Sequence, residues 1–438
     1  MSRRREPVAT ILLALALAPW SAAQVQVTFP LQGFFRPGRF MPVRVQSSSA
    51  SGPVLLRADG AVGVSVEPGP DGAVNAVVPF LVVTQLGTPR WEIAGGASGT
   101  AAASVTPLRD DQVLVGVVGP DTGAAASAAA KLFPGRQVIP VSLAGTPAMS
   151  GAPAAWETLD AVVFDDATHV FLAELLQLGV SVVVRSDAPP AGNWAWQGGA
   201  GHWYVRHNPA GPRGAIEPGA YEPIAAWRPG WPSPLRRRAA LLATVFCIVA
   251  VGVTLWRRTR RAALAIVAAS VVAAAGFTWW GRRQPMWCEL DTRVVVTGPG
   301  GGHVDDWTYY RPLRPREVTV KVDRGSNFRD KPVFDSTQHL RQTGLLLHVD
   351  ASGRPTGFTW HADGGTTLAF LNRSFFTGVG VAPGPTRSPP LSPARELAVR
   401  CYLQPGDTLS EDPTQPDPEP DAAWSTRWPT VTVERPPR

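Results

Sequence analysis

Cysteine is scarce in this sequence. The 438 residues include three cysteines, and none of them lies between residues 24 and 246, so this stretch has no thiol nucleophile. Cys247 falls inside an apolar run, where it is expected to pack as a small apolar side chain. Cys288 and Cys401 lie in the C-terminal third. Two interpretations of them stay open: a disulfide bridge, which an oxidising compartment permits, or two unpaired buried thiols.

Motifs that carry well-defined chemistry are also missing. No G-x-S-x-G stretch follows a predicted strand, which excludes the nucleophile turn of an α/β-hydrolase. The turn at residues 119–123 (GPDTG) lacks the lysine and spacing of a P-loop and the third glycine of a dinucleotide fingerprint. We interpret it as a strand-to-helix turn in which Asp121 or Thr122 caps the helix. The sequence predicts no cofactor and no bound metal.

Lysine is nearly absent, with only Lys131, Lys321 and Lys331. The formal net charge is +7, from 41 basic and 34 acidic residues. Twelve of the arginines lie at the N-terminus or beside two long apolar runs, and without them 29 basic residues face 34 acidic ones. The rest of the chain is therefore near neutral or mildly acidic, which argues against nucleic acid as a partner.

Two apolar runs, residues 239–256 and 262–280, contain no charged residue and are separated by residues 257–261 (RRTRR). At about 1.5 Å per residue each run would be about 27–29 Å long as a helix, close to the roughly 30 Å of a bilayer's hydrocarbon core. The sequence therefore predicts a hairpin of two transmembrane helices. Because neither helix would carry an acidic or basic side chain, no ion or proton pathway is expected.

The N-terminus predicts export. Residues 3–5 (RRR) precede a short apolar core, and small residues at 21–23 offer a cleavage site, so residues 1–23 are predicted to be a signal peptide. The first helix would then run inward, residues 257–261 would face the cytoplasm, and the second helix would run outward, which agrees with the positive-inside rule. We therefore expect a multi-pass protein of the cytoplasmic (inner) membrane, in contact with the lipid bilayer. Its N- and C-terminal domains would lie on the periplasmic or extracellular side.

The exported N-terminal half divides into two patterns. Residues 24–108 contain short runs rich in β-branched and aromatic residues between Gly- and Pro-containing turns, which predicts a β-sandwich. In residues 109–210, apolar strands alternate with helices, and Gly179 is placed to end the second helix. That alternation predicts a parallel sheet covered by helices, a flavodoxin-like α/β domain. The predicted strands are 112–119, 136–143, 159–164 and 181–185, and the predicted helices are 124–133 and 168–178.

Residues 211–238, rich in Pro and Trp, are predicted to link this domain to the first apolar run. Residues 281–403 are again β-rich and predict a further exported domain, and residues 404–438 read as a Pro-rich acidic tail with a final strand near 430–434. The fold class is thus multidomain α/β plus β. It comprises a β-sandwich, a flavodoxin-like domain, a two-helix transmembrane hairpin and a C-terminal β-rich domain.

The order of these patterns resembles a known family. After the predicted sandwich come LVGVVG (114–119), LDAVVFDD (159–166), GVSVVV (179–184) and GAGHWYV (199–205), and then the apolar runs. Over residues 24–256 this order looks like bacterial membrane-anchored envelope proteins whose middle domain is similar to class I glutamine amidotransferases. Class I glutamine amidotransferases use a Cys-His-Glu triad. Because the cysteine is missing here, the resemblance implies a degenerate, non-catalytic domain.

Asp165, Asp166 and His169 form the strongest candidate ligand site. They follow a predicted parallel strand, and open α/β sheets bind ligands at the carboxyl ends of their strands. Two carboxylates and an imidazole could take a divalent cation or polarise a substrate. Alternatively, Asp166 or Thr168 caps the next helix and the other side chains face water.

Two further groups stand out. Trp194, Trp196, Trp203 and Tyr204 could form a platform for a glycan or a partner, or could pack together with nearby tryptophans. In the second group, His303, Asp305 and Asp306 follow a glycine run and could form a metal-binding loop or a solvated turn.

We expect a non-enzymatic, membrane-anchored envelope protein that acts as a scaffold or partner-binding module outside the cytoplasmic membrane, with another envelope protein as its partner. Two alternatives remain. One is a small-ligand-binding or sensing subunit of a transport or signalling complex. The other is a divergent hydrolase or transferase that uses the edge formed by Asp165, Asp166 and His169.

Overall fold

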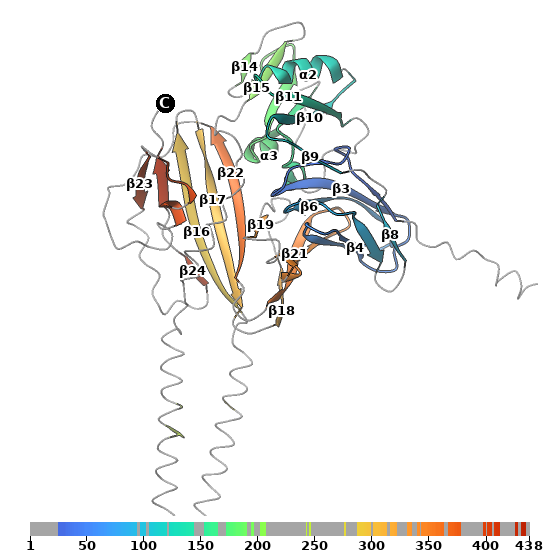
Figure 1. The fold of residues 1–438 in the computed structure, drawn as a ribbon, viewed down its shortest axis with the longest axis vertical. Coiled ribbons are helices and arrows are strands. Elements are labelled where there is room, and N and C mark those ends of the chain that lie inside the picture. Colours follow the sequence, from blue (N-terminus) through green and yellow to red (C-terminus); the bar gives the residue numbers. More distant parts are fainter. Residues whose placement is uncertain are drawn as a thin grey trace, which may run out of the picture.

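The computed structural model shows a β-rich fold of several sheets, with few helices in the part of the chain that it describes (Figure 1). The three largest assemblies are named here the N-terminal sheet pair, the α/β sheet and the C-terminal sheet. The structure describes residues 25–93, 97–101, 105–120, 122–143, 153–164, 172–190, 194–196, 202–206, 242, 245–246, 276, 287–298, 301–312, 316–321, 331–334, 340–341, 343–362, 367–377, 397–399, 401–404, 407–411, 425–427 and 431–434.

The first member of the N-terminal sheet pair has three antiparallel strands in the order β1-β3-β6. They are β1 (Gln26–Thr28), β3 (Arg39–Ser47) and β6 (Val74–Val82). Most side chains of β3 and β6 are buried, so both strands lie inside the molecule. Beside them, the two-residue strands β2 (Phe34–Phe35) and β9 (Thr106–Pro107) pair in parallel.

The second member of the pair joins distant parts of the chain. Its seven strands run in the order β18-β21-β20-β5-β4-β7-β8. The N-terminal strands are β4 (Val54–Arg57), β5 (Gly63–Val66), β7 (Arg90–Ile93) and β8 (Ser98–Thr100). The C-terminal strands are β18 (Arg316–Lys321), β20 (Leu346–Val349) and β21 (Pro355–Ala362). The halves meet where β5 pairs in parallel with β20, from Gly63 opposite Leu346 to Val66 opposite Val349.

One hydrophobic core holds the sheet pair together, and both halves of the chain build it. Phe40 and Phe80 come from the N-terminal half, while Phe358 and Trp360 come from β21. All four side chains are at most 2% exposed. The strands predicted from residues 24–108 therefore complete their core with residues more than two hundred positions later.

The α/β sheet has the order β11-β10-β12-β13-β15-β14, and its first four strands are parallel to one another. The next two, β15 and β14, extend the sheet in antiparallel fashion. The strands are β10 (Gln112–Val118), β11 (Gln137–Ser142), β12 (Ala161–Phe164), β13 (Ser181–Arg185), β14 (Ala195–Trp196) and β15 (Trp203–Arg206).

Short helices cover both faces of the α/β sheet. The alanine face of α2 (Thr122–Ala130) packs on one side, where Ala125, Ala128 and Ala129 are buried. On the other side lie Trp156 of the 3₁₀ helix η1 (Pro153–Trp156) and Leu175 of α3 (Leu172–Gln177). The continuous burial of β12 and of most of β13 follows from this double cover.

The C-terminal sheet is built around a long antiparallel hairpin of β16 (Trp287–Gly298) and β17 (Gly301–Pro312). Its order is β19-β22-β17-β16-β25-β23, with β24 also pairing with β16. The further strands are β19 (Lys331–Val333), β22 (Leu368–Thr377), β23 (Thr408–Glu411), β24 (Ser425–Arg427) and β25 (Val431–Glu434). Parts of the region predicted as a Pro-rich acidic tail are therefore strands of this sheet.

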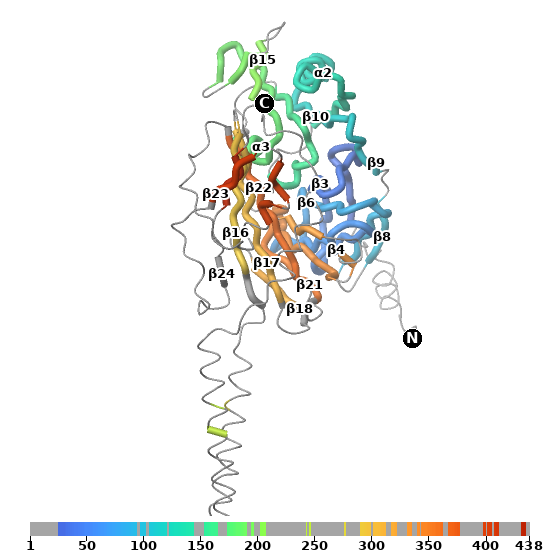
Figure 2. Tube along the Cα trace, turned by 60° about the vertical axis from the view of Figure 1, so that its left-hand side comes forward, coloured from blue at the N-terminus to red at the C-terminus, as the bar shows by residue number. Residues whose placement is uncertain are grey.

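In its C-terminal half the chain crosses repeatedly between the C-terminal sheet and the sheet pair. From β17 it passes to β18 of the sheet pair, returns to β19, leaves again for β20 and β21, and returns to β22. In Figures 1 and 2, β22 of the C-terminal sheet lies beside β21 and β18 of the sheet pair. Tyr310, Leu368 and Phe370 of the C-terminal sheet join the core of the sheet pair. Part of the region 281–403 thus shares a core with the N-terminal half, while a second core lies within the C-terminal sheet.

The prediction of a multi-pass inner-membrane protein is corrected by the structure. Within the described ranges no helix is long and apolar enough to cross a membrane. The helices α2 and α3 have nine and six residues, well short of the roughly 20 that a span requires. Outside the described residues lie the predicted signal peptide 1–23, the linker 211–238, the turn 257–261 and the apolar runs, except for Leu242, Val245, Phe246 and Gly276.

Candidate functional site

Asp165, Asp166 and His169, the predicted ligand site, lie outside the described residues. The last described residue before them is Phe164, which ends β12 in the middle of the α/β sheet and is 2% exposed. Phe164 is in register with Val118 at the end of β10. The role of the three polar residues stays a prediction.

The cysteine pair also stays a prediction. Cys288 lies on β16 opposite Arg311, and its side chain is outside the described part of the structure. Cys401 is half-buried and packs against the core of the C-terminal sheet.

The predicted aromatic group is divided between the interior and the surface. Trp203 is 8% exposed and packs under α2, whereas Trp196 is 67% exposed. Trp194 is partly buried against the opposite face of the sheet, and Tyr204 is half-buried. Sequence alone did not separate the core tryptophan from the surface one.

His303, Asp305 and Asp306 lie on strand β17, so neither a loop nor a solvated turn describes them. Strand alternation sends Asp305 and Asp306 to opposite faces. Asp306 forms an exposed ion pair with Arg293 at 2.6 Å, while Asp305 is fully buried. Among the described side chains, no group of three His, Cys, Asp or Glu residues is arranged to hold a metal ion.

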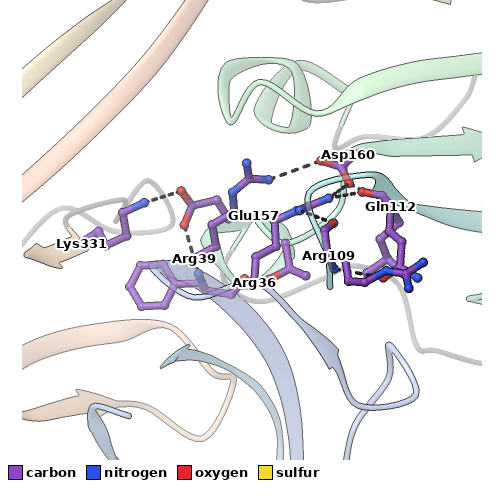
Figure 3. A network of polar contacts seen from close by, with 10 residues as sticks. Arg36, Arg39, Arg109, Gln112, Glu157, Asp160 and Lys331 are labelled. Carbon is purple, nitrogen blue, oxygen red and sulfur yellow. Dashed lines mark hydrogen bonds and ion pairs between the residues drawn. The ribbon is translucent and has the colours of Figure 1, made fainter. Parts of the chain in front are cut away.

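The structure instead places two carboxylates where the three assemblies meet. They belong to the junction network, which comprises Arg36, Arg39, Glu157, Asp160 and Lys331 (Figure 3). Asp160, immediately before β12, accepts hydrogen bonds from Arg36 at 2.9 Å and from Arg39 at 3.4 Å. The same carboxylate accepts the backbone N–H of Leu114 in β10 at 2.9 Å. Asp160 thus ties β3 and the segment before it to the α/β sheet.

Glu157 connects all three assemblies. Lys331, at the start of β19 in the C-terminal sheet, donates to Oε1 of Glu157 at 2.6 Å. The backbone N–H of Phe40, on β3 of the sheet pair, donates to Oε2 at 3.1 Å. Beside it, the backbone N–H and hydroxyl of Thr158 both donate to the carbonyl of Phe40, at 3.0 and 2.7 Å. The segment after η1 therefore docks on the open edge of β3 beyond the end of β1.

Electrostatics at Glu157 follow from burial and pairing. Burial alone would raise the pKa of Glu157, but the charge and hydrogen bond of Lys331, the Phe40 N–H and Arg39 together hold that pKa below its ordinary value. Burial lowers the pKa of Lys331, and Glu157 offsets this only in part. Side-chain exposure is 13% for Lys331 and 19% for Glu157, so the pair is largely withdrawn from water.

A second buried group, the Asp305 network, lies within the C-terminal sheet. Arg373 on β22 donates two hydrogen bonds, of 2.7 and 2.6 Å, to the carboxylate of Asp305. The hydroxyl of Tyr402 donates to the same carboxylate at 2.5 Å and accepts the indole N–H of Trp307 at 2.7 Å. The His303 ring stands at the edge of this group, with Nε2 at 4.0 Å from Asp305.

Burial and neighbouring charges explain the pKa shifts of Asp305 and Tyr402 in this network. Burial would raise the pKa of Asp305, but Arg373, His303 and the Tyr402 hydroxyl outweigh it and lower that pKa. Burial and the charge of Asp305 raise the pKa of Tyr402 well above its usual value. Asp305 therefore stays ionised and Tyr402 stays protonated near neutral pH, a static arrangement that suits structural support better than proton transfer.

Sequence inspection missed the junction network. Glu157 precedes a predicted strand and Asp160 lies near its start, no motif marks either residue, and their side-chain partners lie over a hundred residues away. One signal was present: Lys331 is a lysine in a chain whose other basic residues are nearly all arginine.

No protein-family model, curated protein or solved structure matches the chain, so its function has to be argued from this geometry.

Proposed function

We propose that this chain is a non-enzymatic scaffold that presents a partner protein with surfaces from all three assemblies. The scaffold role needs the assemblies to keep fixed relative positions, and a shared strand pair and a shared carboxylate both favour this. The chain crosses repeatedly between the C-terminal sheet and the sheet pair, which joins these two assemblies covalently, and the β5–β20 pairing binds the two halves of the chain within the sheet pair.

The α/β sheet is proposed to be flavodoxin-like and to correspond to the degenerate amidotransferase-like domain implied by the sequence. In chain order its four parallel strands lie as second, first, third and fourth, which is the flavodoxin-like arrangement. The missing cysteine in residues 24–246 supports a non-catalytic role for this domain.

One observation carries the scaffold proposal: Glu157 contacts Lys331 of the C-terminal sheet and Phe40 of the sheet pair while belonging to the α/β assembly. A carboxylate with both oxygens engaged across two junctions resists displacement of any one assembly. The Asp305 carboxylate is engaged in the same way within its own sheet.

The test compares partner capture by two variants of the full chain. Crosslinking followed by mass spectrometry identifies the protein captured by the wild type. We expect Glu157→Gln to weaken that capture strongly, because the assemblies lose their common anchor. A triple variant, Asp165→Ala, Asp166→Ala and His169→Ala, is expected to capture the partner normally. Capture that survives Glu157→Gln unchanged would contradict the scaffold proposal.

A second candidate is small-ligand binding at the carboxyl edge of the α/β sheet. The observation that favours it is the register of Val118 with Phe164, which brings the ends of β10 and β12 side by side. The chain leaves these strands towards opposite sides of the sheet, because β11 lies beyond β10 and β13 lies beyond β12. Ligands of open α/β sheets bind at such a switch point. Small-ligand binding that the triple variant loses, while it still captures the partner, would favour this candidate.

A further inference from the structure

The outer edge of the α/β sheet carries an exposed aromatic pair. Trp196 of β14 is directly opposite Tyr204 of β15 in an antiparallel pair, so both side chains leave the same face of the sheet. Side chains in such a pair have Cβ atoms about 4.5–5.5 Å apart. Trp196 is 67% exposed and Tyr204 is half-buried. Both views place this hairpin at the end of the molecule remote from β4 and β8 (Figures 1 and 2).

The opposite face of the hairpin accounts for the exposure. Trp203 and Val205 point under α2 and fill the core there, so the alternating residues Tyr204 and Arg206 must take the other face. Arg206 is in register with Val182 of β13, on the face whose inner part is covered by η1 and α3. Trp194 packs at the boundary of that cover. The row from Trp194 to Trp196 therefore runs from the core out to the solvent.

The size of this surface limits its ligand. In the part of this surface that the structure describes, two strands, one of only two residues, present one large exposed ring, one half-buried ring and one guanidinium. A stable protein interface buries about 800 Å² on each partner and involves about 20–30 residues a side, far more than these few residues supply. A flat aromatic pair instead matches one or two sugar rings, whose polarised C–H groups are attracted to the negative face of an indole or phenol ring.

Charge narrows the ligand class. Arg206 lies on the same strand face as Tyr204, two residues further along β15. A guanidinium presents a planar fork that matches a carboxylate with two parallel hydrogen bonds. Arg185 is also exposed, but it is in register with Trp203 and so belongs to the other face.

From these positions we infer that Trp196, Tyr204 and Arg206 form a binding site for a carbohydrate chain with hexuronate units. The rings stack on the sugars and Arg206 takes a carboxylate. This site is separate from the scaffold role, because partner capture and sugar binding are measured independently of each other.

The test uses the full chain and two probes, galacturonate oligosaccharides and their methyl esters, with binding measured by calorimetry. We expect Trp196→Ala to weaken binding of the acid form about tenfold or more, and Trp196→Tyr to retain most of it. Arg206→Gln should weaken binding of the acid form but not of the ester, so that the difference between the two probes disappears. Arg185→Gln is the matched control, since it removes an exposed arginine of the same sheet from the other face, and it should bind like the wild type.

Three results would overturn the inference. The first is absence of saturable binding of both probes to the wild type. The second is unchanged affinity in Trp196→Ala, which, being 67% exposed in the parent, is expected to fold normally. The third is binding of a synthetic acidic, proline-rich peptide with the sequence of residues 411–421 more tightly than either sugar, which would make the surface a peptide site.

Discussion

At the scale of single residues, buried carboxylates connect the strands and assemblies of this molecule. Glu157 and Asp160 each accept hydrogen bonds from more than one assembly or strand, and Asp305 accepts three within the C-terminal sheet. Exposed pairs behave differently: Arg109 and Asp111 are over 60% exposed, and such pairs contribute at most about 1 kcal/mol. The buried acids are therefore where substitutions will be felt.

Replacement of Glu157 by Gln is expected to destabilise the fold by about 3 kcal/mol or more, because it leaves the buried Lys331 ammonium without its countercharge. The free energy of unfolding from urea titration measures this. The double variant Glu157→Leu with Lys331→Met should recover part of the loss, since an apolar pair leaves no unpaired charge. Asp111→Asn is the control and should change stability by less than about 1 kcal/mol. A cost for Glu157→Gln no larger than for the control would disprove the structural role of the pair.

The Asp305 network predicts a pH dependence. Because the folded-state pKa of Asp305 is lowered, its ionisation stabilises the fold above the unfolded-state pKa of about 3.9, and this contribution is lost as pH falls from there through the lower folded-state value. Unfolding free energies of wild type and Asp305→Asn, measured between about pH 3 and 7, should therefore converge as the pH falls. At pH 7 the variant should be less stable by about 3 kcal/mol, because the buried Arg373 guanidinium loses its countercharge. Curves that stay parallel down to low pH would show that Asp305 is not the titrating group.

At the scale of elements, the end of α3 shows how a local signal also meets a tertiary demand. The N–H of Gly179 bonds to the carbonyl of Leu176, and that of Val180 bonds to Leu175, both at 2.9 Å. With φ at +75° for Gly179, this is a Schellman motif. The predicted helix end at Gly179 is confirmed. Sequence did not show that a Cβ at this position would lie 2.6 Å from the ring of Phe375 on β22.

Gly179→Ala should accordingly cost more than the left-handed conformation alone requires. Gly135 provides the matched control, since its φ is +76° but nothing lies within 4 Å of the position that a Cβ would take there. We expect Gly135→Ala to cost about 1–2 kcal/mol and Gly179→Ala to cost more, because the Phe375 ring must also move. Thermal denaturation of both variants measures the difference. Adding Phe375→Ala should leave Gly179→Ala with no steric cost beyond that of the control, and equal costs in the two single variants would refute the contact.

Strand β11 shows how an edge is protected. The amides of Gln137 and Leu143 bond inward, to Asp111 and Val117, so the intervening even-numbered amides face away from β10. Pro140 occupies one of these outward positions. Its missing N–H costs the sheet no hydrogen bond and removes a donor from the exposed edge. This edge is therefore poorly suited to pairing with another chain.

At the scale of the whole molecule, the N-terminal sheet pair is incomplete until the C-terminal half is present. Without β18, β20 and β21, strand β5 loses its parallel neighbour and the core loses Phe358 and Trp360. The distance in sequence between β5 and β20 makes this pairing late and entropically costly in folding.

A chain that ends at residue 238 is therefore predicted to lack a cooperatively folded sheet pair. Hydrogen exchange should show little protection of the β5 amides in this truncation, whereas a chain that ends at Glu434 retains every described strand and should protect them as the full chain does. Supplying residues 281–438 as a separate fragment should restore protection at least in part. Full protection of β5 in the short chain alone would contradict the shared sheet.

Local patterns determined much of this protein. The alternation of apolar strands and short helices in residues 109–210, the strand character of residues 24–108 and the turn at Gly179 all follow from side-chain periodicity and backbone preference, which act over a few residues. The prediction of localisation was wrong: the length of the two apolar runs suggested membrane spans, yet the described helices are too short to cross a membrane.

Only the tertiary structure decided which strands share a sheet and which charges share a junction. The pairing of Val64 with Leu347 and the contact of Glu157 with Lys331 join positions that no periodicity connects. Burial likewise separated Trp203 from Trp196, two identical side chains seven residues apart. The physical reason is that burial and countercharge depend on what the rest of the chain brings alongside, and a sequence records only what lies next along the chain.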